Sequence, residues 1–238
     1  MISWAVRRTS ILLAMISLFI RTPASADAAT PLPGIDVSEY QKTIDWNEVG
    51  SSDVRFVIMR ATKGLDYVDA KYAINSVAAT AEGIKWTAYH YAVPAGKKGD
   101  AVLQANHFAE TADLKPGNIL PVLDLEATGG LGKGRLEDWT AQWVNRVYHL
   151  TGAKAIIYSS PSFWRTALGD STRFSSHGYK LWLANWDVKK PDVPARNWSG
   201  HGWTFWQWTN CGSVVGITGC VDKDRFNGTQ IGSLFTIH

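Results

Sequence analysis

Residues 56–59, Phe-Val-Ile-Met, form an uninterrupted apolar run in the first third of the chain. A second run of the same kind, Ala-Ile-Ile-Tyr, occupies residues 155–158. Runs that lack the alternation of a half-exposed strand are typical of strands buried on both faces, as in parallel sheets. These two stretches therefore predict a mainly parallel sheet with helices on its faces.

Six more strand-like segments and four helical patterns surround these two runs. Eight strands alternating with helices in about 210 residues favour a closed barrel over an open sheet. Helical patterns accompany the first five units, whereas loops rich in Gly, Pro, Asn and Trp join the last three strands. We expect an α/β fold, a modified TIM-like barrel of five β/α units closed by three further strands. The alternative, an open doubly wound sheet, lacks the Gly-rich phosphate loop after its first strand. The expected strands are residues 34–38, 55–61, 85–92, 119–126, 154–159, 180–185, 204–209 and 219–225, and the expected helices are residues 70–82, 100–113, 135–150 and 161–168.

The N-terminal 26 residues carry a targeting pattern. Arg7 and Arg8 precede an apolar run over residues 11–20, and small residues stand before Asp27. This pattern is typical of a secretory signal peptide, and it predicts a secreted protein, either extracellular or periplasmic. An uncleaved anchor is the alternative, although the run is short for a bilayer span. We therefore expect a signal peptide over residues 1–26, a short linker over 27–33 and one barrel domain over 34–238.

The net charge of +3 is misleading, because the first 26 residues contain three arginines and no acid. The rest of the chain has 21 basic and 21 acidic residues. It therefore lacks the basic surplus that nucleic-acid binding requires, and we expect neither a nucleic-acid partner nor, after signal removal, a membrane partner. We expect the protein to be a monomer.

The two cysteines, Cys211 and Cys220, are nine positions apart. A metal site needs more ligands than these two thiols, so we expect neither a metal nor another cofactor. In an oxidising compartment the simplest expectation is a disulfide, which the chain-entropy model values at roughly 2–3 kcal/mol. Two reduced, buried thiols are the alternative.

The segment 121–126, Pro-Val-Leu-Asp-Leu-Glu, contains the strongest local signal for chemistry. Asp124 and Glu126 are two positions apart on an expected strand, so their side chains should share one face. At the C-terminal end of a barrel strand they would enter the usual site of barrel chemistry. Two adjacent carboxylates raise the pKa of one of them, as the general acid of a glycosidase requires. A salt-bridged strand end is the alternative for this pair alone.

Further acids belong to the first and last expected strands, which are neighbours in a closed barrel. Asp36 is near the end of the first strand, and Asp222 and Asp224 lie in the last. All three are therefore candidates for the same barrel mouth. A turn cap is the structural alternative for Asp36. For Asp222 and Asp224 the alternatives are pairing with Lys223 or Arg225, or a calcium site.

Aromatic residues are unusually frequent, with 12 tryptophans, and many follow expected strands. Flat rings pack on the apolar faces of sugars, and amide side chains bind sugar hydroxyl or acetamido groups. Core packing is the alternative for at least half of these aromatics, and we expect His90 to be a hydrogen-bonded core residue. The candidate substrate-binding residues are Tyr89, Tyr91, Trp182 and Gln207.

Taken together, these motifs resemble the family 25 glycoside hydrolases, the Chalaropsis-type lysozymes. Eight blocks occur in the order of the family and span nearly the whole chain after the expected signal peptide. They are GIDVSEYQKTIDW (34–46), RFVIMRATKG (55–64), TAYHYA (87–92), PVLDLE (121–126), AIIYSS (155–160), LWLANW (181–186), FWQWT (205–209) and VDKDRFNG (221–228).

The resemblance implies the same modified barrel and cleavage of the β-1,4 bond between N-acetylmuramic acid and N-acetylglucosamine in bacterial peptidoglycan. It places the general acid on Glu126 and its partner carboxylate on Asp124. It places two further active-site acids on Asp36 and Asp222, the latter because the family's block puts the site acid before Asp224. Lys63 departs from the pattern, since many members carry Glu there, and this puts the substrate contacts near that position in doubt.

Two mechanisms remain open for the second carboxylate. Asp124 could attack the sugar directly, or it could orient and stabilise the substrate's own 2-acetamido group as the nucleophile. We favour the second route, because Asp124 stands beside the general acid rather than across the sugar from it. A chitinase-type barrel is a rival, but only the last Asp-x-Glu of its longer signature is present. A wall-binding protein without catalysis is another rival, and the complete set of four acids argues against it.

Overall fold

The computed structural model describes residues 1–2 and 30–236. The predicted signal peptide, apart from its first two residues, and the start of the predicted linker lie outside this range, so both stay predictions. The end of the linker is corrected, because Leu32 and Pro33 already belong to the first strand of the barrel. Among the described helices, none combines the length and the apolar character needed to cross a membrane.

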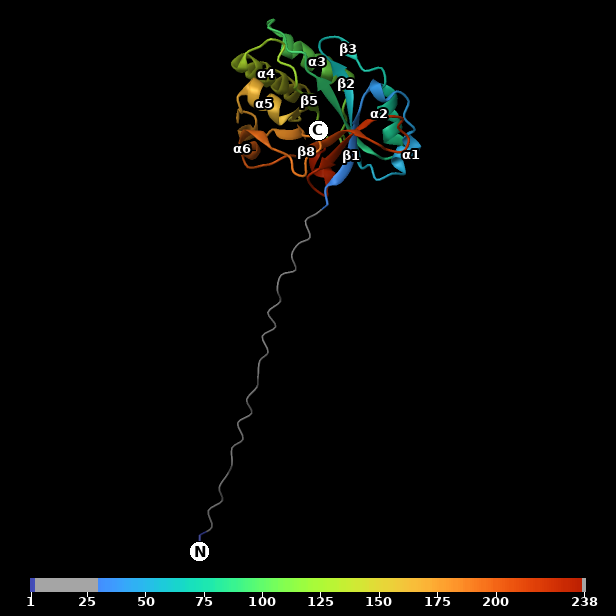
Figure 1. The fold of residues 1–238 in the computed structure, drawn as a ribbon, viewed down its shortest axis with the longest axis vertical. Coiled ribbons are helices and arrows are strands. Elements are labelled where there is room, and N and C mark those ends of the chain that lie inside the picture. The colour runs from blue at the N-terminus through green and yellow to red at the C-terminus, as the bar shows by residue number, and fades with distance from the viewer. Residues whose placement is uncertain (3–29, 237–238) are drawn as a thin grey trace.

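Eight strands close into a barrel (Figure 1). Their order around it is β1, β2, β4, β5, β6, β7, β8 and β9, and β1 pairs with both β2 and β9. Neighbours from β1 to β8 are parallel, whereas β9 is antiparallel to β8 and β1. The expected α/β barrel is confirmed. The strands are β1 (Leu32–Val37), β2 (Phe56–Lys63), β4 (Lys85–Tyr91), β5 (Val122–Asp124), β6 (Ile156–Ser159), β7 (Lys180–Ala184), β8 (Phe205–Gly212) and β9 (Val221–Phe226), with β3 (Tyr67–Val68) as a short partner of β2.

Helices surround this barrel, and β8 is followed directly by β9 without a helix between them. The four expected helices are present as α2 to α5. Local signals fix α5: the Ser160 hydroxyl accepts from the Phe163 amide, Pro161 occupies the first turn, and Gly169 ends the helix at positive φ. These are favourable residues for the start and end of a helix. The helices are α1 (Trp46–Gly50), α2 (Tyr72–Ala81), α3 (Asp100–Ala112), α4 (Lys133–Thr151), α5 (Pro161–Leu168) and α6 (Pro194–Ser199).

The short helices α1 and α6 were not expected from the sequence. The five-residue α1 begins at an Asp45 cap, whose carboxylate accepts two amide hydrogens. In α6 the backbone has positive φ from Ala195 to Ser199. L-residues rarely adopt this left-handed conformation, so a helical sequence pattern does not reveal it. Conversely, β5 is shorter than expected, and Ile119 forms only an isolated bridge with Phe235.

The hydrophobic core has two parts, one between the barrel and its helices and one inside the barrel. Aromatic rings fill the inside, with centroids 4.9 Å apart for Phe56 and Phe205 and 5.3 Å for Phe205 and Phe226. Further along the same strands the inward positions become polar, with Arg60 on β2 and Gln207 on β8. One end of the barrel is therefore closed by apolar packing, and the other is available for chemistry.

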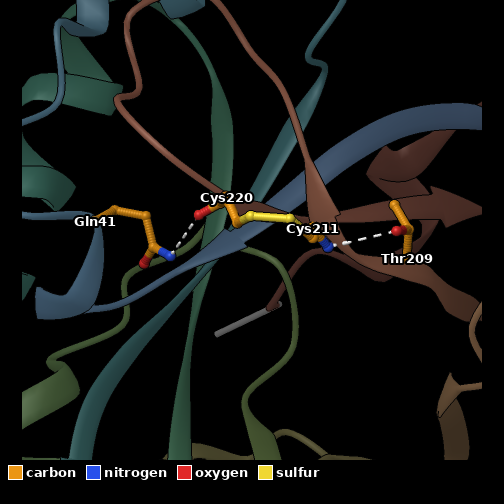
Figure 2. Close-up of a disulfide and its surroundings, with 4 residues drawn as sticks. All are labelled: Gln41, Thr209, Cys211 and Cys220. Atoms are coloured by element: carbon orange, nitrogen blue, oxygen red, sulfur yellow. Dashed lines mark hydrogen bonds between the residues drawn. A yellow bond between two sulfur atoms is a disulfide. The ribbon is translucent and has the colours of Figure 1, made fainter.

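Cys211 and Cys220 form the expected disulfide, which joins the end of β8 to the start of β9 (Figure 2). The Gln41 amide donates to the Cys220 carbonyl at 3.4 Å, and the Cys211 amide donates to the Thr209 hydroxyl at 3.4 Å. The bridge therefore fixes the connection through which the last strand enters the barrel.

Candidate active site

Asp124 and Glu126 project from the end of β5 as the sequence predicts. Leu125 between them is fully buried on the outside of the barrel. Its amide donates to the Tyr158 carbonyl at 3.0 Å, and its carbonyl accepts from the Ser159 hydroxyl at 3.0 Å. These contacts to β6 hold the backbone extended beyond β5, so the two acids stay on the inner side. Asp124 is buried, whereas Glu126 reaches solvent at the mouth.

The electrostatic environment raises the pKa of both acids. For Asp124 burial is the main cause, the charge of Glu126 adds to it, and the Arg60 guanidinium opposes both. Loss of hydration also raises the pKa of Glu126, while a hydrogen bond from the Tyr91 hydroxyl lowers it. Coupled acids of this kind share their protons as a pair. The pair can therefore hold a proton well above the pH at which an isolated carboxyl group loses one.

A second group of acids forms where β1 meets β9. Asp36 pairs in register with Asp222, and Gly34 pairs with Asp224. Because β9 alternates, both of its acids face the barrel interior with Asp36. A side chain at Gly34 is excluded, since a Cβ atom there would lie 2.3 Å from the ring of Phe56. The closure of the barrel thus brings three carboxyl groups together.

Asp36 is hydrogen-bonded to both Asp222 and Asp224. Burial, followed by the charges of Asp224 and Asp222, raises the pKa of Asp36. Burial also raises the pKa of Asp222 to about 6 and that of Asp224 to about 7. The cluster therefore retains protons near neutral pH.

The structure brings both Asp222 and Asp224 into the cluster, so the choice of Asp222 as the active-site acid stays a prediction. Asp224 is buried and accepts a hydrogen bond from the Trp182 indole at 2.7 Å. Pairing with Lys223 or Arg225 does not occur, since these two cations face the outer surface and contact tryptophan rings. In the sequence Val-Asp-Lys-Asp-Arg-Phe (221–226) the two acids alternate with the two cations. On a strand this alternation places the acids on one face and the cations on the other.

Gln207 and Trp182, two of the expected substrate-binding residues, are buried and hold other site residues in place. The Gln207 amide donates to Asp36 at 2.7 Å, and its carbonyl accepts from Tyr158 at 3.0 Å and from the Trp186 indole at 2.8 Å. The ring of Trp182 packs against those of Tyr158 and Tyr89, with centroids 4.4 and 6.1 Å away. These side chains set the positions of the acids, and their contact with substrate stays a prediction.

Tyr89 and Tyr91 face the interior on β4. Tyr89 is buried, and burial together with the charges of Asp36 and Asp124 raises its pKa. Tyr91 is half-buried, and its hydroxyl contacts Glu126. Of these two tyrosines, only Tyr91 combines contact with the expected general acid and access from solvent.

Arg60 is a site residue to which the sequence analysis gave no role. It is buried, and its guanidinium contacts Asp69 at 2.8 Å and Glu39 at 3.3 Å. Its charge partly offsets the rise in the Asp124 pKa that burial and the Glu126 charge cause. The position of this arginine directly after the apolar run 56–59 was the signal in the sequence that could have revealed its role. A cation on a buried strand needs acidic partners, so Arg60 was a candidate site residue.

His90 is confirmed as a core residue. Its ring nitrogens contact Thr62 at 2.8 Å and Gln104 at 3.0 Å, and its ring stacks on Trp143. Burial lowers its pKa to about 4. It lies on the outer side of β4 among α3 and α4 residues, away from the acids.

Two hollows border this end of the barrel, one at Glu126 and one at Lys63, whose ammonium lies 5.0 Å from the centre of the Tyr91 ring. The first has a volume of about 640 Å³ and is lined by Glu126, Tyr158 and Trp186 together with residues of α5 and the loop after β7. The second has a volume of about 460 Å³ and lies beside Lys63 and Arg60. In residues 30–236 no group of three or more His, Cys, Asp or Glu side chains has the arrangement of a metal site. The described part of the site is built from carboxyl groups and aromatic rings together with the Arg60 guanidinium and the Gln207 amide.

Coupled carboxyl groups at the open end of a β/α barrel, bordered by aromatic hollows, define a glycoside hydrolase site. A family model described as Glycosyl hydrolases family 25 matches residues 35–217. The chain belongs to this family, which confirms the resemblance inferred from the eight sequence blocks, and it is a glycoside hydrolase.

Individual relatives agree with this assignment. Lysozyme M1 of Streptomyces globisporus is 34% identical over 219 residues, which cover 88% of this chain and 72% of that protein. The N,O-diacetylmuramidase of Chalaropsis sp is 30% identical over 206 residues, which cover 80% and 95% of the two chains. The solved bacterial lysozyme from Streptomyces coelicolor matches with a TM-score of 0.80 at 30% identity, and the match covers 86% of this chain and 97% of that one.

Proposed function

We propose that the protein is a secreted lysozyme that hydrolyses the β-1,4 bond between N-acetylmuramic acid and N-acetylglucosamine in bacterial peptidoglycan. Family membership supports this, as do the lysozyme and muramidase names of its relatives. The observation that carries the proposal is the Asp124–Glu126 pair at the barrel mouth, where both pKa values are raised.

Glu126 acts as the general acid. It borders the larger hollow, so it can reach a glycosidic oxygen of a glycan that occupies this space. Its raised pKa favours the protonated carboxyl group, and a general acid must carry that proton. After protonation the bond breaks through an oxocarbenium-like transition state at the muramic acid.

Asp124 acts by orienting the substrate's 2-acetamido group and stabilising the positive charge that develops on it. Two features of the site support this role. Asp124 is buried beside Glu126 rather than across the hollow from it. The Arg60 guanidinium partly offsets the rise that burial and the Glu126 charge cause in the Asp124 pKa, and so acts toward the ionised form, which is the form that stabilises a cation.

The remaining expected site residues support these two. Asp36 and Asp222 tune the charge of the mouth and bind sugar polar groups. Tyr91 aligns Glu126, whereas Tyr89, Trp182 and Gln207 form the wall on which the acids and the sugar rest. Their buried hydrogen bonds keep this wall rigid, as a preorganised site requires.

The assignment of Glu126 is tested with Glu126→Gln on purified peptidoglycan. We expect the variant to bind glycan and to lose at least about a hundredfold in turnover, because general acid catalysis contributes 10²–10⁴-fold. New reducing ends are reduced and identified by mass spectrometry, and muramitol ends from the wild type support a muramidase.

The matched control is Glu110→Gln, which changes an exposed glutamate of α3 and should cleave like the wild type. Undiminished turnover by Glu126→Gln would overturn the assignment. Glucosaminitol ends would mean the opposite bond, and preference for chitin would favour a chitinase. Binding without cleavage by the wild type would favour a wall-binding protein.

The role of Asp124 is tested separately. Asp124→Asn should lower turnover by several orders of magnitude, because the neutral amide does not stabilise the cationic intermediate. The wild type is also treated with a fluorinated glycan analogue that traps covalent glycosyl-enzymes, and its intact mass is measured. An unchanged mass agrees with the substrate-assisted route, whereas an adduct on Asp124 would establish direct attack.

We infer further that the protein is exported, acts as a monomer and takes the glycan strand as its partner. The paired cysteines support export, because disulfides persist in oxidising compartments. N-terminal sequencing of the protein recovered from culture medium tests removal of residues 1–26, and light scattering tests the oligomeric state.

A further inference from the structure

Lys63 is the last residue of β2 and pairs in register with Tyr91 on β4. Its ammonium group is 5.0 Å from the centre of the Tyr91 ring. The hydroxyl of the same tyrosine contacts Glu126. A solvent-exposed cation therefore stands one side chain away from the expected general acid.

This cation is not neutralised by the protein. Among the described residues Lys63 makes no ion pair, although acids are present nearby. Glu39 contacts Arg60 and the Tyr67 hydroxyl, and Asp69 contacts Arg60. Of the three acids that line the smaller hollow, Glu39 is thus occupied by Arg60, and Asp100 accepts hydrogen bonds from Gln104 and from the Trp139 indole. The third, Asp66, forms no ion pair with Lys63, so the Lys63 ammonium is available to a ligand.

The lining of the smaller hollow combines this cation with apolar and aromatic side chains and with charged ones, Arg60, Glu39, Asp66 and Asp100. Tyr40, Leu65, Tyr67 and Val93 line its volume of about 460 Å³ together with Lys63. Tyr40 is largely exposed, so the hollow is open to solvent. Such walls suit a short aliphatic arm, and the ammonium suits a carboxylate at the end of that arm.

We propose that Lys63 binds a carboxylate carried on the lactyl arm of the muramic acid next to Glu126. The inference rests on the proposed function, because the lactyl arm distinguishes muramic acid from N-acetylglucosamine. The carboxylate has two possible sources: the arm itself, where no peptide is attached, or the stem peptide that extends the arm. Lys63 then determines which glycan strands bind well, without taking part in bond cleavage.

The test compares three glycan preparations with the wild type and Lys63→Gln. One preparation carries intact stem peptides, one has been treated with an amidase that frees the lactyl carboxylates, and one has all carboxylates converted to methylamides. Lys63 should recognise one of the two charged preparations. On that preparation we expect the KM of Lys63→Gln to be about fivefold higher than that of the wild type, because an exposed ion pair contributes about that much to binding. The kcat should be unchanged. For the methylamide preparation, the wild type and the variant should have equal KM.

Lys85→Gln is the matched control. Lys85 also places its ammonium over an aromatic ring, that of Phe235 at 5.7 Å, but it begins β4 at the opposite end of the barrel. This variant should match the wild type on all three preparations. An equal KM effect of both lysine variants would indicate unspecific attraction and would overturn the proposal.

Other outcomes distinguish failure of the proposed role of Lys63 from failure of the proposed function. If the wild type cleaves glycan but Lys63→Gln has unchanged KM on every preparation, the role of Lys63 is wrong and the proposed function stands. A lower kcat with unchanged KM would show that Lys63 acts on Glu126 through Tyr91, which also overturns the proposal. If the wild type cleaves no preparation, the proposed function fails and the role of Lys63 fails with it.

Discussion

Asp224 is buried against Asp36 and Trp182, and its pKa is raised to about 7. An unfolded aspartate has a pKa near 3.8. Between these two pH values the folded protein binds more protons than the unfolded chain, so this group's contribution to stability falls as pH rises. It is fully present below about pH 4 and is lost as pH passes through about 7.

Asp224→Asn removes this titration and keeps the side chain nearly isosteric. The variant should resemble the wild type near pH 4 and be more stable at pH 8, by on the order of a few kcal/mol. Thermal unfolding from pH 4 to pH 8 measures the difference. Asp53→Asn, at an exposed position, serves as the control and should show no such divergence. Parallel curves for the wild type and Asp224→Asn would contradict the prediction.

Among single residues, the pair Asp124 and Glu126 was predictable because i and i+2 positions of a strand share a face. Arg60 was not, since its role depends on Asp69 and Glu39, which meet it only after folding. The difference is physical: strand alternation is local, whereas the partners of a buried cation come from other segments.

At the scale of the element, the charged residues of β9 are divided between the two faces of the strand, with the acids on one face and the cations on the other. Its acids face the mouth, whereas Arg225 lies over the rings of Trp206 and Trp208, with distances of 5.1 and 4.7 Å to their centres. Cation–π contacts of this kind stabilise about as much as an exposed ion pair or slightly more, at about 0.5–1 kcal/mol. These contacts pack side chains over the outer surface of β8 and β9, the two strands that no helix connects.

The link between β8 and β9 gives a prediction for stability. Replacing Cys211 and Cys220 together by serine should lower the free energy of unfolding by about 2–3 kcal/mol, because the unfolded chain gains freedom. For a domain of this size the melting temperature should fall by roughly 5–10 °C. Calorimetry with and without reductant measures both values.

The double serine variant provides its own control, since reductant should lower the melting temperature of the wild type alone. Lysis of peptidoglycan well below the melting temperature should persist in both proteins, because the acids do not belong to the bridged loop. An unchanged melting temperature on reduction would show that the bridge contributes nothing to stability.

The sequence predicted all eight barrel strands and four of the helices, because each has a periodic or continuous apolar pattern. It did not predict α6, whose left-handed backbone between Ala195 and Ser199 contradicts local preferences. It placed the end of β5 too late, because hydrogen bonds of Leu125 to β6 extend the chain without a regular ladder.

At the scale of the whole molecule, the count of strands made the closure of the barrel predictable. The arrangement of the site that this closure creates could be predicted only in part. The sequence suggested that the first and last strands meet, and the register of Asp36 with Asp222 agrees. It did not indicate how Gln207 and Trp182 would be used, because their hydrogen bonds depend on the interior packing of four strands.

The pairing of β1 with β9 also has a consequence for the order of folding. The hydrogen bond between Asp36 and Gln207 joins residues 171 positions apart, and β9 enters later still. Contacts so distant in sequence form late, because the entropy of closing the loop opposes them until most of the chain is in place. A chain that is still being synthesised therefore has Asp124 and Glu126 but lacks the opposite wall of the mouth. We expect hydrolytic competence to be gained in the last step of folding, when the final strand is inserted.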